Sequence, residues 1–179
     1  MASDPIPIRR LDCHEIGRVW EIDRREVIHR VYRLVDGALL LEPHDFDVPG
    51  WPPGEPEAYG PLLEAALDRG GVAFAAFAGE TLVGVSILDS KPVGGAGDAL
   101  QLMFLHVSRD WRRQGLAGRL FDLAAGEARR GGAGWLYISA TPSENTVDWY
   151  HRRGCVLARL PDPELFALEP EDIHLEYRL

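Results

Sequence analysis

The strongest indication of the fold lies in residues 99–118, Ala-Leu-Gln-Leu-Met-Phe-Leu-His-Val-Ser-Arg-Asp-Trp-Arg-Arg-Gln-Gly-Leu-Ala-Gly. Its first nine residues are almost all apolar, which is typical of a strand buried on both faces in the middle of a sheet. A polar turn over 108–114 follows, and a helix is predicted over 115–130 from its apolar residues at helical spacing. Such a strand, turn and helix create an anion site, because the first N–H groups of a helix lack partners.

The residues at the start of this helix suit a phosphate group. Gly115, Ala117 and Gly118 are small enough to let a pyrophosphate approach the backbone, and the cations Arg112, Arg113 and Arg119 surround them. Neither a G-x-x-x-x-G-K-[ST] loop for nucleoside triphosphates nor a G-x-G-x-x-G loop for dinucleotides is present. The turn therefore favours another phosphate-bearing ligand, while simple packing of small residues at a helix start remains an equal alternative at this point.

The remaining chain indicates one α/β domain over 1–179, with a central, mostly antiparallel sheet flanked by helices. Helices are predicted from Asp12 to about Val27, over 57–69, and from Ser143 to Gly154, and strands over 5–11, 72–78, 81–88, 135–140, 155–160 and 173–179. The apolar runs around Asp36-Gly37 fit either a hairpin or a helix end with a loop. Five prolines predict an irregular segment over 43–57, and the glycines of 91–97 predict a turn.

Composition and charge exclude several classes. Asp and Glu number 28 against 19 Lys and Arg, a formal charge of −9 that is unsuited to binding duplex nucleic acid. We expect a cytoplasmic protein without membrane segments, because the chain has neither a secretory signal nor eighteen consecutive apolar residues. Cys13 and Cys155 are far apart and the six histidines show no ligand spacing, so we expect reduced thiols and no metal.

The segment Arg112-Arg113-Gln114-Gly115-Leu116-Ala117 matches the R/Q-x-x-G-x-G/A signature of the GNAT superfamily of acyl-CoA-dependent N-acyltransferases. The chain resembles that family around the signature as well. Leu105-His106-Val107 precedes it, Leu120 follows it, and Tyr150-His151-Arg152-Arg153-Gly154 supplies a Tyr-x-x-x-Gly motif further on. The resemblance covers roughly 72–160 well, and 1–71 only in the order of elements.

The resemblance implies a splay between the strands at 99–107 and 135–140, into which the pantetheine arm of CoA inserts. It implies an acyl-CoA-binding core over 72–160, acceptor-side helices and a loop over 1–71, and a C-terminal loop and strand over 161–179. Acetyl-CoA would donate its acetyl group directly to a primary amine of a small molecule or peptide. The residues implied to bind the donor are Leu105, His106, Val107, Arg112, Arg113, Gln114, Gly115, Leu116, Ala117, Gly118 and, where the family often has Asn, Ser143.

Acyl transfer to an amine needs an acid for the leaving thiolate and a base for the amine. Tyr150 stands where the family usually has the tyrosine that protonates the CoA sulfur, and packing beside Trp149 is its alternative role. Gln101 and Met103 occupy positions that often carry Glu or His, so Gln101 could only hold a water that relays a proton. Strand alternation points His106 away from Gln101, which favours a structural role for that histidine.

The acceptor side remains open in the sequence. The segment 29–56 carries acidic and aromatic residues suited to a cation, and a solvated acidic loop is the equal alternative. The candidates for acceptor binding or proton removal are Glu26, Glu42, His44, Asp45, Asp47 and Trp51. A non-catalytic acyl-CoA-binding or sensor module, and an interaction protein with an accidental motif, are the other functions considered. A homodimer through the C-terminal sheet edge is left open.

Overall fold

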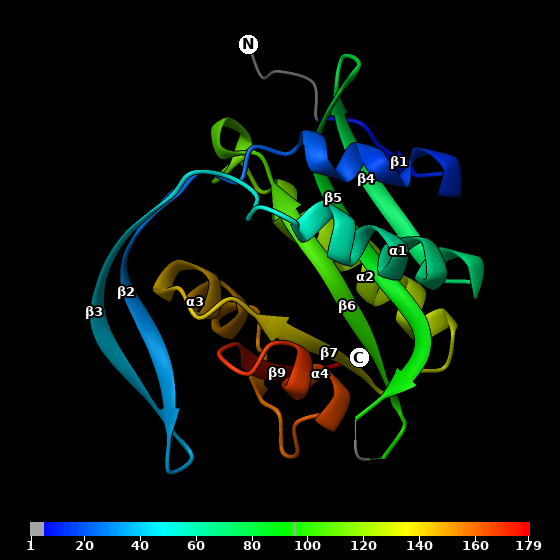
Figure 1. The fold of residues 1–179 in the computed structure, drawn as a ribbon. Coiled ribbons are helices and arrows are strands. Elements are labelled where there is room, and N and C mark those ends of the chain that lie inside the picture. Colours follow the sequence, from blue (N-terminus) through cyan, green and yellow to red (C-terminus); the bar gives the residue numbers. More distant parts are fainter. Residues whose placement is uncertain (1–5, 95) are drawn as a thin grey trace.

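The computed structural model describes residues 6–94 and 96–179, and a seven-stranded sheet forms its centre (Figure 1). The strands lie in the order β1 (Ile8–Arg10), β4 (Val72–Ala78), β5 (Thr81–Val93), β6 (Ala99–Val107), β7 (Trp135–Ala140), β9 (Ile173–Arg178) and β8 (Val156–Leu157). Every neighbouring pair is antiparallel except β6 and β7, which are parallel. The predicted mixed, mostly antiparallel sheet is confirmed.

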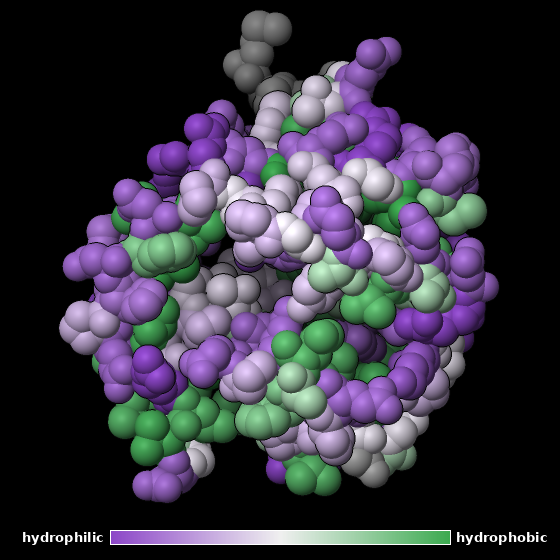
Figure 2. Space-filling view, in the orientation of Figure 1, coloured by the Kyte–Doolittle hydropathy of each residue, from purple (hydrophilic) through white to green (hydrophobic). Residues whose placement is uncertain are grey.

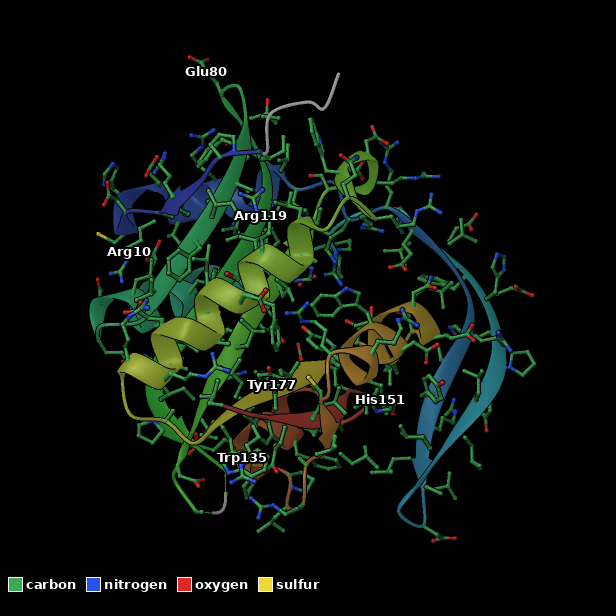
Figure 3. All side chains as sticks on the ribbon, turned by 180° about the vertical axis from the view of Figure 1, so that it is seen from behind. Arg10, Glu80, Arg119, Trp135, His151 and Tyr177 are labelled. Atoms are coloured by element: carbon green, nitrogen blue, oxygen red, sulfur yellow. The ribbon has the colours of Figure 1, made fainter. Side chains whose placement is uncertain are left out.

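Helices cover both faces of this sheet. The helical elements are η1 (Cys13–Glu21), α1 (Glu55–Asp68), η2 (Arg109–Trp111), α2 (Leu116–Arg130), α3 (Glu144–Arg152) and α4 (Pro163–Leu168). η1 and α1 pack on one face, where Val19 and Leu63 join Phe104 of β6 in one apolar cluster. α2 lies across the other face, seen from behind in Figure 3, and buries Leu120 and Phe121. No helix in the described part of the chain is long and apolar enough to cross a membrane.

The first helix and the segment after it differ from the prediction. The helix predicted to reach Val27 ends at Glu21, because the chain becomes extended at Ile22. The β-branched residues that follow, such as Val27 and Ile28, favour a strand. β2 (Glu26–Val35) and β3 (Ala38–Val48) form a separate two-stranded sheet that curves away from the body (Figure 1). The hairpin alternative is therefore correct. Its two turn residues, Asp36 and Gly37, have φ values of 49° and 79°, as a type I′ turn requires.

The prediction of an irregular segment over 43–57 is wrong for its first part. β3 continues to Val48 and includes Pro43, which a two-stranded ribbon tolerates because one edge of each strand has no ladder partner. A register shift between Ile28 and Arg30 accommodates the extra residue. The acidic residues of this segment are therefore placed on a strand rather than in a loop.

Four other assignments along the chain also change. β5 extends to Val93, so the predicted turn over 91–97 begins later, and Gly95 within it lies outside the described residues. The predicted strand over 155–160 pairs only at Val156–Leu157, and the strand over 5–11 only at Ile8–Arg10, with Pro5 outside the described residues. Helix α4 was not predicted, because six residues are too few to show a helical period.

β6 and β7 separate after a short paired region. They pair only where Ala99–Gln101 meets Trp135–Tyr137, although β6 runs on to Val107. β7 instead pairs along its whole length with β9, from Trp135–Arg178 to Ala140–Ile173. The predicted splay is confirmed, and it leaves backbone groups of β6 without a partner on this side.

Candidate active site

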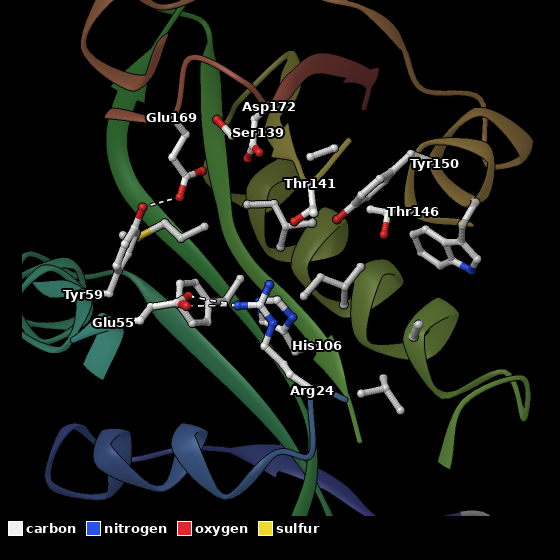
Figure 4. Close-up of a pocket in the computed structure, with 18 of the residues that line it drawn as sticks. Arg24, Glu55, Tyr59, His106, Ser139, Thr141, Thr146, Tyr150, Glu169 and Asp172 are labelled. Atoms are coloured by element: carbon white, nitrogen blue, oxygen red, sulfur yellow. Dashed lines mark hydrogen bonds and ion pairs between the residues drawn. The ribbon is translucent and has the colours of Figure 1, made fainter. Parts of the chain in front are cut away.

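A cavity of about 1470 Å³ occupies the space opened by the splay. It runs from the first turn of α2, along the separated ends of β6 and β7, to the loop between α4 and β9. Figure 2 shows the surface hollowed between the hairpin β2–β3 and the start of α1, and Figure 4 shows the residues deep in the cavity. The site thus has a donor end at α2 and a second end beside the C-terminal segment.

The first turn of α2 fits a pyrophosphate. Gly115, the N-cap, has φ +77° and no side-chain cap, and a Cβ built there meets nothing within 4 Å. Arg113, two residues earlier, has φ +60°, and both residues line the cavity together with Leu116, Ala117 and Gly118. The free N–H groups and positive end of the helix therefore face open space that an anion fills without displacing a side chain.

Of the three other residues predicted near the donor, Arg112 lines the cavity and the other two do not. Arg112 donates from Nε to the Val107 carbonyl at 3.0 Å and reaches the Asp23 carbonyl at 3.4 Å, so its guanidinium holds the turn together. Gln114 donates to the Asp110 carbonyl at 3.0 Å and does not line the cavity. Arg119 is exposed on the outer side of α2 (Figure 3). The structure therefore does not bring Gln114 or Arg119 to the cavity.

Tyr150 lies in α3 and is 6% exposed, with its hydroxyl facing the cavity near Thr141 (Figure 4). Ser143 begins this helix, accepting from the Thr146 N–H at 3.4 Å and donating to Thr146 Oγ1 at 2.9 Å. Ser143 itself does not line the cavity, whereas Asn145 and Thr146 do. Burial above all, and then Cys155 and Asp172, raise the pKa of Tyr150, so the phenol keeps its proton at neutral pH.

The prediction that His106 points away from Gln101 is wrong. The pairing of β6 with β5 shifts register between Phe104 and Leu102, which leaves Met103 as an extra residue in a bulge. The alternation of side chains between the two faces of the sheet is therefore shifted by one residue at the bulge. As a result, both Gln101 and His106 line the cavity. A bulge of this kind leaves no mark in an apolar run, which is why sequence alternation misses it.

His106 is held in an aromatic cluster. Its ring centroid lies 5.1 Å from those of Trp51 and Phe104. Burial, and the cations Arg24 and Arg112, lower the pKa of His106 to about 3. The imidazole is therefore neutral and a poor proton acceptor near pH 7.

The second end of the cavity carries carboxyl groups that sequence reasoning missed. Glu55 of α1 binds Arg24 through both carboxylate oxygens at 3.1 Å, and Tyr59 donates a hydrogen bond to Glu169 (Figure 4). Asp172 lies beside Glu169, and burial together with that neighbour raises the pKa of Asp172 above its usual range. The acidic run from Glu169 to Asp172, just before the last strand, is the signal that would have pointed to this end.

Four of the predicted acceptor residues lie away from the cavity. Glu42, His44, Asp45 and Asp47 are on β3 and none of them lines it. Glu42 pairs with Arg33 at 2.8 Å, and Asp45 with His29 at 2.9 Å, both pairs on the surface of the hairpin. These residues are on β3, whose side chains here lie on the surface of the hairpin. From the sequence, the strand was not expected to continue beyond residue 42.

Two further candidates stay near the site. Glu26 lines the cavity with an oxygen 3.9 Å from Arg112. Trp51 lies behind the cavity wall, where its indole donates to the Ile22 carbonyl at 2.9 Å and its ring lies 4.8 Å from the Arg24 guanidinium. Trp51 therefore supports Arg24 and His106 from behind.

A sheet that opens between two parallel strands, above an uncapped helix N-terminus, defines a class of α/β proteins that take an extended, phosphate-bearing ligand between the strands. The family model described as "Acetyltransferase (GNAT) family" matches residues 38–155. The chain belongs to the GNAT acetyltransferase family. The acyl donor of this family is acetyl-CoA, and no metal is needed.

Solved structures agree with this fold, whereas direct comparison with curated proteins gives no match. Nourseothricin acetyltransferase is 20% identical, with a TM-score of 0.71 over 96% of this chain and 97% of that one. The PaiA N-acetyltransferase of Thermoplasma acidophilum, solved with coenzyme A, is 14% identical, with a TM-score of 0.63 over 98% and 99% of the two chains. A GNAT acetyltransferase of Elizabethkingia anophelis with acetyl-CoA bound is 17% identical, with a TM-score of 0.53 over 66% and 82%.

Proposed function

We propose that this chain transfers the acetyl group of acetyl-CoA directly to a primary amine of a cationic small molecule or peptide. The observation that carries the proposal is the position of the Tyr150 hydroxyl, which faces the cavity between the open turn of α2 and the acidic end. The proton donor would therefore lie between the site for the anionic acyl donor and the site for the cationic acceptor. Acetyl-CoA supplies the thioester when it is bound.

The chain offers a distinct group for each requirement of the donor. The N-terminus of α2 would bind the pyrophosphate through Gly115 and its neighbours, and the unpaired edge of β6 would bind the pantetheine amides as another strand would. Tyr150 would then donate its proton to the departing sulfur, since a phenol and a thiol have similar basicity. Cys155 is unsuited to covalent catalysis, because burial raises its pKa to about 12.

Charge around the cavity favours a cationic acceptor. At this end of the cavity, seven carboxyl groups and three cations of the described residues line the wall. Each cation pairs with one of these carboxyl groups, so four carboxyl groups have no cationic partner in the described chain. The carboxyl groups belong to Glu55, Asp89, Asp162, Glu164, Glu169, Glu171 and Asp172, and the three cations to Arg24, Arg69 and Lys91. Excess negative charge in a cleft attracts an ammonium group and raises its local concentration.

The acceptor class is supported only in outline by the solved structures. One similar protein is named for acetylating nourseothricin, and its identity to this chain is 20%. Nourseothricin therefore belongs in a panel of acceptors beside polyamines, amino sugars and short peptides, as a probe rather than as the expected substrate.

Calorimetric titration with acetyl-CoA and CoA, followed by thiol release across the amine panel, tests the proposal. We expect micromolar donor binding and thiol release that depends on at least one cationic amine. Donor binding without thiol release from any amine would favour a non-catalytic acyl-CoA-binding or sensor module. Absence of donor binding would contradict both functions and favour an interaction protein.

A further inference from the structure

We propose that Asp172 is the base that takes the proton from the acceptor's ammonium group, and that Glu169 and Tyr59 position this carboxyl. The inference rests on the proposed transfer to an amine and assigns the proton acceptor that such a transfer needs. Gln101 and His106, the polar side chains of β6 that line the cavity, cannot fill this role, because an amide has no basic site and the imidazole is held neutral with a depressed pKa.

The strand register brings Asp172 to the reacting end of the cavity. Ala140 pairs with Ile173 at the end of β7, so Asp172 lies beside Thr141, just past the last paired residues. This is the side on which β7 has separated from β6. The helix that carries Tyr150 begins at Glu144, only a few residues beyond Thr141. The acid and the carboxyl thus reach the same end through two neighbouring backbone segments.

Asp172 differs from the other carboxyl groups near Tyr150 in its partners. Arg24 binds Glu55, Arg112 lies near Glu26, and Tyr59 donates to Glu169. No Lys, Arg or His of the described chain lies within 4.0 Å of the Asp172 carboxyl. Burial, and then its neighbour Glu169, raise the pKa of Asp172, and Arg24 only partly offsets this. Asp172 is therefore the carboxyl with the strongest tendency to take up a proton.

A buried polar atom points to a ligand at the same place. The hydroxyl of Ser139, on β7, is inaccessible to solvent and has no hydrogen-bond partner in the described chain. Ser139 lines the cavity beside Asp172 and Glu169 (Figure 4). Unpaired buried hydroxyls are uncommon, because the loss of hydrogen bonding to water is not recovered. An amine or water bound between Ser139 and Asp172 would satisfy this group.

The proposed step balances in protons and bonds. The ammonium group gives one proton to Asp172, which passes it to solvent, and the neutral nitrogen forms the C–N bond while the C–S bond breaks. Tyr150 gives its proton to sulfur, and the second proton lost by nitrogen restores the phenol. The products are the N-acetyl amine, CoA thiol and one released proton.

The test compares two nucleophiles in wild type, Asp172→Asn and the matched control Asp68→Asn, an exposed residue at the end of α1. Spermidine or nourseothricin, whichever wild type turns over faster, serves as the protonated amine. O-methylhydroxylamine serves as an amine that is already neutral at the assay pH. We expect Asp172→Asn to lower kcat/KM for the protonated amine by about 100-fold or more and for O-methylhydroxylamine by only a few-fold. Asp68→Asn should match wild type with both.

The outcomes separate this inference from the proposed function. Wild type without turnover on any amine overturns the acetyltransferase proposal, and the base with it. If wild type is active, the inference about Asp172 alone is overturned in two cases, provided that calorimetry shows unchanged CoA affinity. Either Asp172→Asn keeps wild-type kcat/KM for the protonated amine, or it loses kcat/KM equally for the protonated amine and for O-methylhydroxylamine. Should Asp172→Asn fail to fold, Glu169→Gln provides the second test. Removing that charge should shift the acidic limb of the kcat/KM profile to lower pH, and an unshifted limb overturns the inference.

Discussion

The Tyr137 hydroxyl lies 2.7 Å from His174 Nδ1 and accepts the Asp162 N–H at 2.8 Å. This buried pair joins β7 and β9 to the residue that begins α4. Asp162 in turn caps that helix, accepting from the Glu164 N–H at 3.0 Å. The segment that carries Glu169 and Asp172 is therefore anchored at its start by Tyr137 and at its end by the pairing of β9 with β7.

Replacing Tyr137 by Phe should lower the free energy of unfolding by about 1–3 kcal/mol, because buried partners in His174 and the Asp162 backbone lose their hydrogen bonds. Urea denaturation measures this loss. Tyr177→Phe is the matched control, since its hydroxyl makes no hydrogen bond among those of the described residues and packing against Phe121 is retained. Equal stability of the two variants would contradict the anchoring role.

Gly115→Glu should abolish binding of CoA, because the new carboxylate would occupy the open space before α2 and repel the pyrophosphate. Calorimetric titration with CoA checks this. Gly132→Glu is the control, since Gly132 has φ +82°, is exposed at the far end of α2 and likewise has nothing within 4 Å of its Cβ position. Comparable backbone strain arises in both variants, so CoA binding lost in both would point to unfolding rather than to the anion site.

Tyr150→Phe should lower kcat by about 100-fold or more while leaving CoA affinity unchanged, because only the proton donated to sulfur is lost. Thiol release under saturating acetyl-CoA measures the change. Phe fills the same space against Phe121 and Trp149, so the packing of α3 is kept. Near-normal turnover would assign Tyr150 to packing alone.

Asp45→Asn and Asp47→Asn should leave amine selectivity unaltered, because both side chains are exposed on β3 and neither lines the cavity. Glu169→Gln should instead raise KM for a cationic amine several-fold, since a negative charge at the acidic end is removed. Steady-state kinetics with spermidine and with a neutral amine distinguish the two results. A change in selectivity with the β3 variants would return the acceptor site to the hairpin.

Acidification should destabilise the protein partly through His106. Its pKa is lowered in the folded state to about 3, so the unfolded chain binds a proton first as the pH falls below the ordinary histidine value of about 6.5. The free energy of unfolding therefore decreases as the pH falls from 7 toward 4. His106→Phe removes this contribution and should show a shallower decrease in urea denaturation across that range. An identical slope in both proteins would mean that His106 titrates normally.

Much of the fold followed from local pattern. The apolar strand over 99–107, the glycine-started helix after it and the paired strands over 72–78 and 81–88 each carry a period or a turn that neighbouring residues alone determine. The open turn at Gly115, which we propose for the donor, was predictable for the same reason, because its residues are contiguous in the chain. Helix α4 and the far half of β3 were not, since a six-residue helix has no period and Pro43 interrupts the strand pattern.

The class of fold, the strand–turn–helix unit and the place of Tyr150 in its helix follow from spacing within short segments, so they could be predicted from the chain alone. Which carboxyl groups meet at the second end of the cavity depends instead on how distant segments pack. Glu55 and Asp172 are far apart in the chain and are brought to one cavity by the packing of α1 and the pairing of β9 with β7. The bulge at Met103, which turns His106 toward the cavity, likewise depends on the neighbouring strand. Contacts between distant segments depend on strand register and packing, and neither leaves a local pattern in the chain.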